Sequence, residues 1–515
     1  MRWPEDINPR TLSSFESQAR RLRYQVLGIA CHQASIPSLL VAHHEDDQAE
    51  TVLVRMVRDG TGLGLTGIAP VNDIPECFGL YGVHQSGNPH LKRSDHNDHA
   101  SKIQYHWKRR PNMEFEDGGI KIMRPLLKFS KERLIATCLQ RGVSWVEDET
   151  NKDPTLTIRN AVRHIYRNYR LPPALSKERL LALSSIEVTR MAKYKAHVEL
   201  LFNRCKLKLD TRSGTLAVEF PPGSLALGKG LKQQISNESE EAPSTEPSAL
   251  SDENPNSEEV HLIVYMLVRR LIEIVTPKEK VSLQLVRRAP LYSLLPSLAP
   301  SHAVGETQKE NASKFSIANV YFEREVIYPE TSGQEPLNFP TKPPDVEPRH
   351  VWHLSRVGYT RSPLDELLKA IIPVPPYSNP PDYQFFDGRF WIRVSNETPH
   401  PLVIRPFCQT DLKPFLASLT LDTGRRFLKS LKMAAPAGVR WTLPVIAMAE
   451  PNDGGTGHKV NGSKKLETPS GRVIALPTFN VRAENERWLG KVTWSVRYRK
   501  VDLGQHNKEK VVVGF

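Results

Sequence analysis

Residues 38–53, which read SLLVAHHEDDQAETVL, decide the fold of the first part of this chain. The apolar run at the start predicts a short buried strand over residues 38–42. Glu45, Asp46 and Asp47 then open a helix, because carboxylates in a first turn are stabilised by the helix dipole. A polar cluster thus follows the carboxyl end of a strand, which is where open α/β sheets bind ligands.

The predicted helix has a polar face that suits a binding site. Asp47, Glu50 and Thr51 are spaced i, i+3 and i+4, so they share one face. His43 and His44 directly precede the helix and favour a functional interpretation over an ordinary acidic first turn. The set could also ligate a metal, but it lacks the His-x-x-x-His spacing of a zinc helix, so we predict no dedicated metal site.

After residue 119 the sequence again predicts regular secondary structure. Residues 120–123 predict a strand, and Ser130 is a good N-cap for a helix over residues 131–141 that Gly142 closes. The apolar run 143–146 predicts another short strand.

Arg159 and Arg163 lie four residues apart on a further predicted helix, so both guanidinium groups can face one site. The planar fork of arginine suits phosphate or carboxylate. Two ordinary surface arginines are the alternative.

Three segments together resemble the tRNA(Ile)-lysidine synthetases, which are ATP-dependent enzymes of the PP-loop family. Residues 43–51 match the His-His-x-x-Asp-x-x-Glu-Thr segment of that family, and Arg55 and the glycine-rich stretch 60–67 follow it. Residues 16–24 resemble the preceding helix. The second family signature is matched by residues 124–127, Arg133, Trp145, residues 148–151 and residues 159–163. The resemblance covers residues 10–170 and fades beyond them.

The resemblance implies a reaction. ATP activates C2 of the wobble cytidine of tRNA(Ile) as an adenylated intermediate, and the ε-amine of free L-lysine then attacks C2. The products are lysidine, AMP and pyrophosphate. ATP is the implied cofactor, with Mg²⁺ that accompanies it and stays mostly water-bound.

The resemblance also assigns roles to residues of this chain. Asp47 and Glu50 match the positions that hold lysine, and with His43 and His44 they are the candidate catalytic residues. Positioned carboxylates could also help the ammonium lose its proton. Three arginines would neutralise the phosphate charge of ATP or bind tRNA. These are Arg133, Arg159 and Arg163.

One family motif is not found. The nucleotide loop Ser-Gly-Gly-x-Asp-Ser is expected on an earlier strand, but the sequence contains no such motif. We therefore expect the PP-loop sheet to be incomplete, either in a truncated chain or in one that has lost catalysis. The alternatives to a lysine ligase are a catalytically inactive tRNA-binding homologue and another PP-loop tRNA-modifying enzyme, such as a thiolase. The absence of a C-x-x-C pair speaks against the thiolase.

The bulk composition agrees with an RNA partner. The chain has 515 residues and a formal net charge of +13, which favours a polyanion. Its five cysteines form no C-x-x-C pair, which argues against a disulfide framework. No apolar run reaches the roughly 18 residues of a membrane span. The sequence does not decide the compartment. We expect an organelle such as the mitochondrion if the host is a eukaryote, and the cytoplasm otherwise. The oligomeric state is also open, a homodimer included.

The predicted fold is an α/β PP-loop domain, a helical middle region and a small α+β C-terminal region. The domain boundaries are placed from composition and from Pro-rich stretches. The first predicted domain is a partial PP-loop domain over 1–170, with a disordered insertion at 82–118. It is followed by a helical region with a hairpin at 171–222, an acidic disordered linker at 223–260, a middle region with Pro-rich loops at 261–408 and a basic C-terminal domain at 409–515.

The C-terminal domain contains a helix, over residues 422–436, that looks like the basic helix of the same family. Four cations make it a candidate for binding tRNA, although a solvated helix face is the alternative. They are Arg425, Arg426, Lys429 and Lys432.

Overall fold

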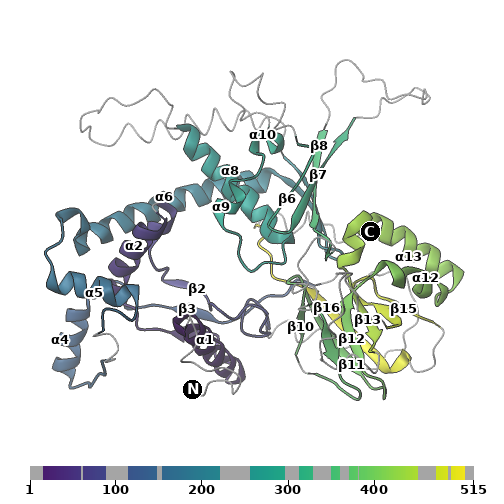
Figure 1. The fold of residues 1–515 in the computed structure, drawn as a ribbon, viewed down its shortest axis with the longest axis horizontal. Helices are drawn as coiled ribbons and strands as arrows, with labels where there is room; N and C mark the ends of the chain where they lie inside the picture. The colour runs from purple at the N-terminus through teal and green to yellow at the C-terminus, as the bar shows by residue number, and fades with distance from the viewer. Residues whose placement is uncertain are drawn as a thin grey trace, which may run out of the picture. The chain divides into compact units, whose positions relative to one another are not determined.

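The structure is a computed structural model, and it forms two compact units (Figure 1). The first contains Met1–Lys92 and Gly118–His197, and the second contains Arg93–Asp117 and Val198–Phe515. The structure describes residues 15–59, 62–88, 114–147, 153–220, 256–295, 312–328, 349–359, 370–380, 382–449, 471–484 and 489–504.

The first unit is built on a small mixed sheet with the strand order β1-β3-β2. Strand β1 pairs with β3 in parallel, and β2 pairs with β3 antiparallel. The elements are α1 (Phe15–Gln33), β1 (Ser38–Leu40), α2 (Glu45–Asp59), β2 (Val71–Asp73) and β3 (Lys121–Met123). A 3-10 turn, η2, covers Gly62–Thr66. The predicted first helix, strand and acidic helix are thus confirmed, and the strand predicted at 120–123 is β3.

Two apolar clusters hold this unit together. The first joins α1 to the sheet and contains Tyr24, Cys31, Ile74, Cys77, Val83, Ile120 and Ile122. The second joins α2 and η2 to α5 (Ile158–Asn168) and α6 (Lys177–Arg204), and contains Val52, Leu53, Leu65, Val162 and Leu180. The second cluster fixes α5 against α2, which brings two signature segments together.

Local signals set the bounds of α4 (Lys131–Arg141) as predicted. The Ser130 side chain accepts a hydrogen bond from the backbone N–H of Arg133, and Gly142 ends the helix in the left-handed conformation. The strand predicted at 143–146 is wrong. These residues are exposed and belong to none of the described sheets. A strand needs a partner for its backbone groups, which an apolar run alone does not supply.

The prediction of a disordered insertion at 82–118 differs from the structure at both ends. Val83 is buried, and Gly87 and Gly118 form an antiparallel bridge. In the second unit, the backbone N–H of Glu116 donates to the carbonyl of Tyr498 at 2.7 Å, and its buried carboxylate accepts a hydrogen bond from Arg497. A polar sequence can therefore be packed when its charges find buried partners. Residues 89–113 lie outside the described part.

The second unit begins with a five-stranded antiparallel sheet of order β4-β5-β8-β7-β6. The strands are β4 (Lys206–Asp210), β5 (Thr215–Glu219), β6 (Lys314–Ile317), β7 (Val320–Ile327) and β8 (Arg349–Arg356). Helix α8 (Asn256–Val275) lies against β5 and β8, and two short helices follow it, α9 (Leu283–Val286) and α10 (Leu291–Leu294). The helix and hairpin predicted over 171–222 are α6 and the pair β4–β5. The region that follows α8 is largely a sheet, whereas the predicted fold had a helical middle region.

Two further sheets complete the second unit, with the orders β10-β11-β16 and β15-β14-β13-β12-β9. Their strands are β9 (Ile372–Val374), β10 (Gln384–Phe386), β11 (Phe390–Asn396), β12 (Leu402–Pro406), β13 (Pro444–Met448), β14 (Val473–Leu476), β15 (Val481–Arg482) and β16 (Val492–Tyr498). Helices α12 (Gln409–Ala417) and α13 (Leu421–Ala434) lie beside the larger sheet (Figure 1). That sheet pairs β12 with β13, so it crosses the predicted boundary at 408/409.

Two strand pairs of the second unit are tight hairpins. Ala318 and Asn319 separate β6 from β7, and Asp387, Gly388 and Arg389 separate β10 from β11. Ala318, Asn319, Asp387 and Gly388 have positive φ, as a tight hairpin turn demands. Most of the predicted linker at 223–260 lies outside the described residues, and its end forms the start of α8.

The described helices include none that combines the length and the apolar character needed to cross a membrane.

Candidate active site on helix α2

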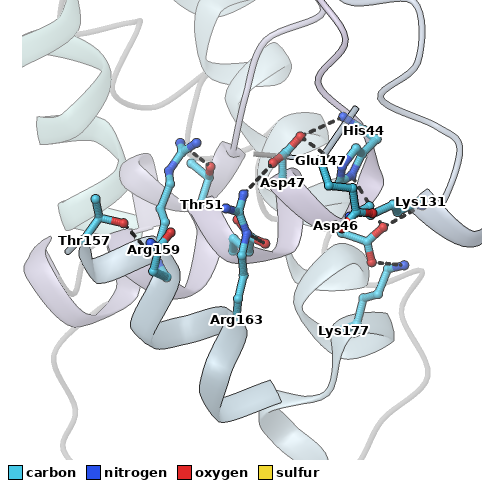
Figure 2. A network of polar contacts seen from close by, with 12 residues as sticks. His44, Asp46, Asp47, Thr51, Lys131, Glu147, Thr157, Arg159, Arg163 and Lys177 are labelled. Carbon is cyan, nitrogen blue, oxygen red and sulfur yellow. Dashed lines mark hydrogen bonds and ion pairs between the residues drawn. The ribbon is translucent and has the colours of Figure 1, made fainter. Parts of the chain in front are cut away.

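The first turn of α2 is fastened to two other helices. The Asp46 carboxylate accepts a hydrogen bond from the backbone N–H of Lys131 at 2.7 Å and pairs with the Lys177 ammonium at 2.7 Å (Figure 2). Lys177 also pairs with Glu45 at 3.1 Å. Burial alone would raise the pKa of Asp46, but the hydrogen bonds from Lys177 and Lys131 outweigh it and lower that pKa. Asp46 thus holds the starts of α4 and α6 against α2.

Asp47, which directly follows Asp46, forms a buried acidic pair with Glu50. Their exposed fractions are only 8% and 6%. Arg163 bridges them, because its Nε lies 2.7 Å from Glu50 Oε1 and its Nη2 lies 3.3 Å from Asp47 Oδ1. Figure 2 shows Arg163 reaching from α5 toward Asp47 on α2. The two carboxylates can therefore share one cation.

The pKa of Glu50 is shifted in the opposite direction to that of Asp46. Burial raises the pKa of this carboxyl above its usual value, and the hydrogen bond and charge of Arg163 only partly oppose the rise. The second oxygen, Oε2, is buried without a hydrogen-bond partner in the described structure. A buried acceptor without a partner is costly, so the pair retains capacity for another donor.

The two histidines lie at the same end of α2. The backbone N–H of His44 donates to Asp47 Oδ2 at 3.0 Å, and its ring lies 3.6 Å from the same oxygen. Burial lowers the pKa of His43, although Asp47 acts in the opposite direction, and Arg124 and Arg159 lower it further. Burial therefore favours the neutral imidazole of His43, and its Nδ1 is buried without a described hydrogen-bond partner.

The structure unites most of the predicted site. Arg159 Nη2 donates to Thr51 Oγ1 at 3.1 Å, so Arg159 and Arg163 both reach the polar face of α2 (Figure 2). Arg133 is different, because its exposed guanidinium lies over the Phe129 ring at 5.0 Å. Its described contacts include neither carboxylate of the buried pair.

The four predicted tRNA-binding cations lie on α13 in the second unit. All four are exposed, and Arg426 pairs with Asp422 at 2.7 Å. Phe427 and Leu431 form part of the buried side of the same helix. The helix is therefore amphipathic, with the cations on its solvent side.

Several residues that shape the site were not found from sequence. Lys131 and Lys177 stand in no motif, and no local signal could have linked them to Asp46. Gln48 and Arg55, by contrast, lie within or directly after the segment 43–51 that the family resemblance covers, and they hold the turn η2. The backbone N–H of Ile68 donates to Gln48 at 2.6 Å, and Arg55 donates to the carbonyl of Gly67 at 2.7 Å. In the described part of the chain, His, Cys, Asp and Glu side chains form no group of three or more that could hold a metal ion.

Comparison with known proteins finds a match for part of the first unit. Residues 1–168 match the model of the PP-loop domain. This range contains both histidines, the acidic pair of α2 and both arginines of α5, whereas Lys177, which supports the first turn of α2, lies just beyond it.

Relatives of the chain include proteins named tRNA(Ile)-lysidine synthase. A probable tRNA(Ile)-lysidine synthase of Schizosaccharomyces pombe is 26% identical over 454 residues, which cover 88% of this chain and 74% of the relative. The enzyme of Bradyrhizobium sp. is 32% identical over 27% of this chain and 27% of its own length. That of Wolbachia pipientis is 30% identical over 37% and 34%. The family resemblance read from the sequence is thus confirmed, while the chain matches about a third or less of these two bacterial relatives.

Proposed function

We propose that this protein is a tRNA-modifying ligase, which joins L-lysine to C2 of the wobble cytidine of tRNA(Ile) at the expense of ATP. The names of its relatives and its PP-loop domain support this assignment. One observation of the site carries it. Asp47 and Glu50 are buried on one face of α2, and both contact a single cation, Arg163. Such a pair suits a substrate that presents an ammonium group.

The proposed reaction has two steps. The cytidine O2 attacks the α-phosphorus of ATP, so a C2–O–P linkage forms and pyrophosphate leaves. The ε-amine of lysine then attacks C2, the C2–O bond breaks, and AMP leaves with that oxygen. The amine must lose protons for this attack, so a base beside it helps the second step.

The residues of the site take distinct roles in this proposal. Asp47 and Glu50 hold the ammonium of lysine, and Glu50, whose pKa burial raises, is suited to receive a proton from it. His43 and His44 contact the nucleotide or the cytidine. Arg159 and Arg163, with Arg133 as the weakest member, neutralise the phosphate charge that develops as pyrophosphate leaves.

ATP is the proposed cofactor, and Mg²⁺ accompanies it. The acids of the first turn do not form a dedicated cage for the ion, since Asp46 is engaged by Lys177 and the backbone N–H of Lys131. Mg²⁺ commonly retains several waters and needs few protein carboxylates. In this proposal Mg²⁺ would neutralise negative charge on the phosphates, and no set of described residues is assigned to it as ligands.

The exposed cations of α13 are proposed to bind the tRNA backbone. Contacts to phosphate release counterions, so binding weakens as salt rises. Replacing Arg425 and Lys429 by alanine should weaken tRNA binding and reduce the slope of log K against log salt by roughly one to two. Filter binding at several salt concentrations measures the slope. An unchanged slope would remove α13 from the interface.

A lysine-transfer assay tests the function. Purified protein, an unmodified tRNA(Ile) transcript, ATP and radiolabelled lysine should give labelled tRNA and equal amounts of AMP. Omission of ATP, or a transcript with uridine at the wobble position, should abolish the label. Release of AMP that does not depend on lysine would contradict the proposal.

A catalytically inactive tRNA-binding homologue is the second candidate. The exposed cations of α13 serve this function equally well, because they can bind tRNA without any catalysis. The same assay separates the two functions. Such a homologue would bind the transcript in a salt-dependent way and transfer no lysine, whatever the ATP concentration.

A further inference from the structure

An exposed aromatic side chain, Trp145, lies two residues before Glu147, and Glu147 is linked through Lys131 to the acidic first turn of α2. We propose that Trp145 is a positioning residue, which stacks on an unpaired base of the RNA that enters the candidate site. The proposal deepens the proposed function and rests on RNA being the substrate. It names the residue that would hold a loop base in place, a role that no part of the reaction described above assigns.

The first observation is the exposure of Trp145 and its neighbours. The indole is 42% exposed, and Val146 beside it is 96% exposed. The whole segment 143–147 is exposed, and α4, which precedes it, has no buried residue. A large exposed apolar surface of this kind commonly marks a binding site.

The second observation is a chain of contacts from Trp145 to the site. Glu147 pairs with the Lys131 ammonium at 3.0 Å, and the backbone N–H of Lys131 donates to Asp46. The pKa of Glu147 is lowered, first by Lys131, with smaller effects from Arg167 and from a hydrogen bond with the Trp145 side chain. Figure 2 draws Glu147 and Lys131 in the same network as Asp46. Trp145 is thereby tied to the residue that directly precedes Asp47.

The third observation is charge, which decides between possible occupants. Residues 128–170 contain nine Lys and Arg against five Asp and Glu. Among the exposed cations are Lys128, Arg133, Arg141, Arg167 and Arg170. A second copy of this surface would be repelled, whereas a polyanion would be attracted. Aromatic rings beside cations are the usual means of holding single-stranded nucleic acid, because every base has a face on which they can stack.

The test compares unpaired with paired RNA. The probes are an anticodon-arm hairpin and a fully paired duplex of the same stem sequence. Trp145→Ala should weaken hairpin binding roughly tenfold or more and leave duplex binding unchanged. Trp145→Phe, which keeps an aromatic face, should restore most of the hairpin affinity. Tyr377→Ala removes an aromatic that is 74% exposed in the second unit, and it serves as the matched control with no expected effect.

Three results would overturn the stacking role. They are an unchanged hairpin affinity, an equal loss for hairpin and duplex, and a change in sedimentation that shows Trp145 to mediate self-association. If the variant also supports lysine transfer, stacking predicts a higher KM for tRNA with kcat retained. The wild-type transfer assay judges the ligase function separately, because a protein that binds the hairpin through Trp145 but transfers no lysine refutes only the ligase.

Discussion

Asp47→Asn is expected to lower kcat/KM for lysine by about 10- to 100-fold, which is the effect of losing one charged hydrogen bond. The affinity for ATP should stay nearly unchanged. The amide keeps the shape of the side chain but removes the negative charge that an ammonium needs. Asp47 is buried and faces Arg163, so solvent cannot replace that charge. Initial rates at varied lysine, together with equilibrium binding of an ATP analogue, measure the two effects.

Asp46→Asn is the matched control, because the adjacent carboxylate has another task. Asp46 links α2 to Lys131 and Lys177. Loss of its charge in Asp46→Asn should therefore lower the free energy of unfolding and leave the affinity for lysine nearly unchanged. Equal losses of lysine use and ATP binding in Asp47→Asn would count against the assignment of Asp47 to the lysine site.

Arg163→Ala is expected to lower the free energy of unfolding of the PP-loop domain by about 3 kcal/mol. The substitution leaves Asp47 and Glu50 buried, adjacent and without the cation that they share. The loss should be smaller in the double variant Arg163→Ala/Glu50→Gln, because the glutamine carries no charge to be stranded. Urea unfolding followed by circular dichroism gives the free energies of unfolding of the wild-type protein, the single variant and the double variant.

The pH dependence of Arg163→Ala gives an independent check. The pKa of Glu50 is already raised in the folded protein, and it should rise further without Arg163. A raised folded-state pKa contributes stability that is present at low pH and is lost as the pH rises through that pKa. The deficit of Arg163→Ala should therefore be larger at neutral pH than at mildly acidic pH. A deficit that grows on acidification would show that Glu50 is not the stranded group.

Local rules allowed much of the PP-loop domain to be predicted. Ser130 and Gly142 mark the ends of α4 because caps act within one turn of a helix. Arg159 and Arg163 reach α2 together because their spacing places them on one helix face. The roles of Asp47, Glu50 and the histidines remain proposals, since geometry shows what they contact and not what they catalyse.

Longer-range contacts could not be predicted in this way. Lys177 pairs with Glu45 and Asp46 more than 130 residues earlier, and no local pattern encodes such a partner. The same holds for Glu116 and Arg497 in the second unit. The hairpin at Asp387 and Gly388 is different, because an Asp-Gly pair between apolar runs is a local turn signal that the sequence itself carries.

Titration of the wild-type protein with L-lysine tests the central claim most directly. The claim is that the acidic face of α2 binds the side-chain ammonium of a free amino acid. Isothermal titration should show binding of L-lysine and an affinity at least about tenfold lower for 6-hydroxynorleucine, whose hydroxyl replaces the ammonium. Equal affinities for the two compounds would contradict the claim, because the buried carboxylates would then not recognise the charge.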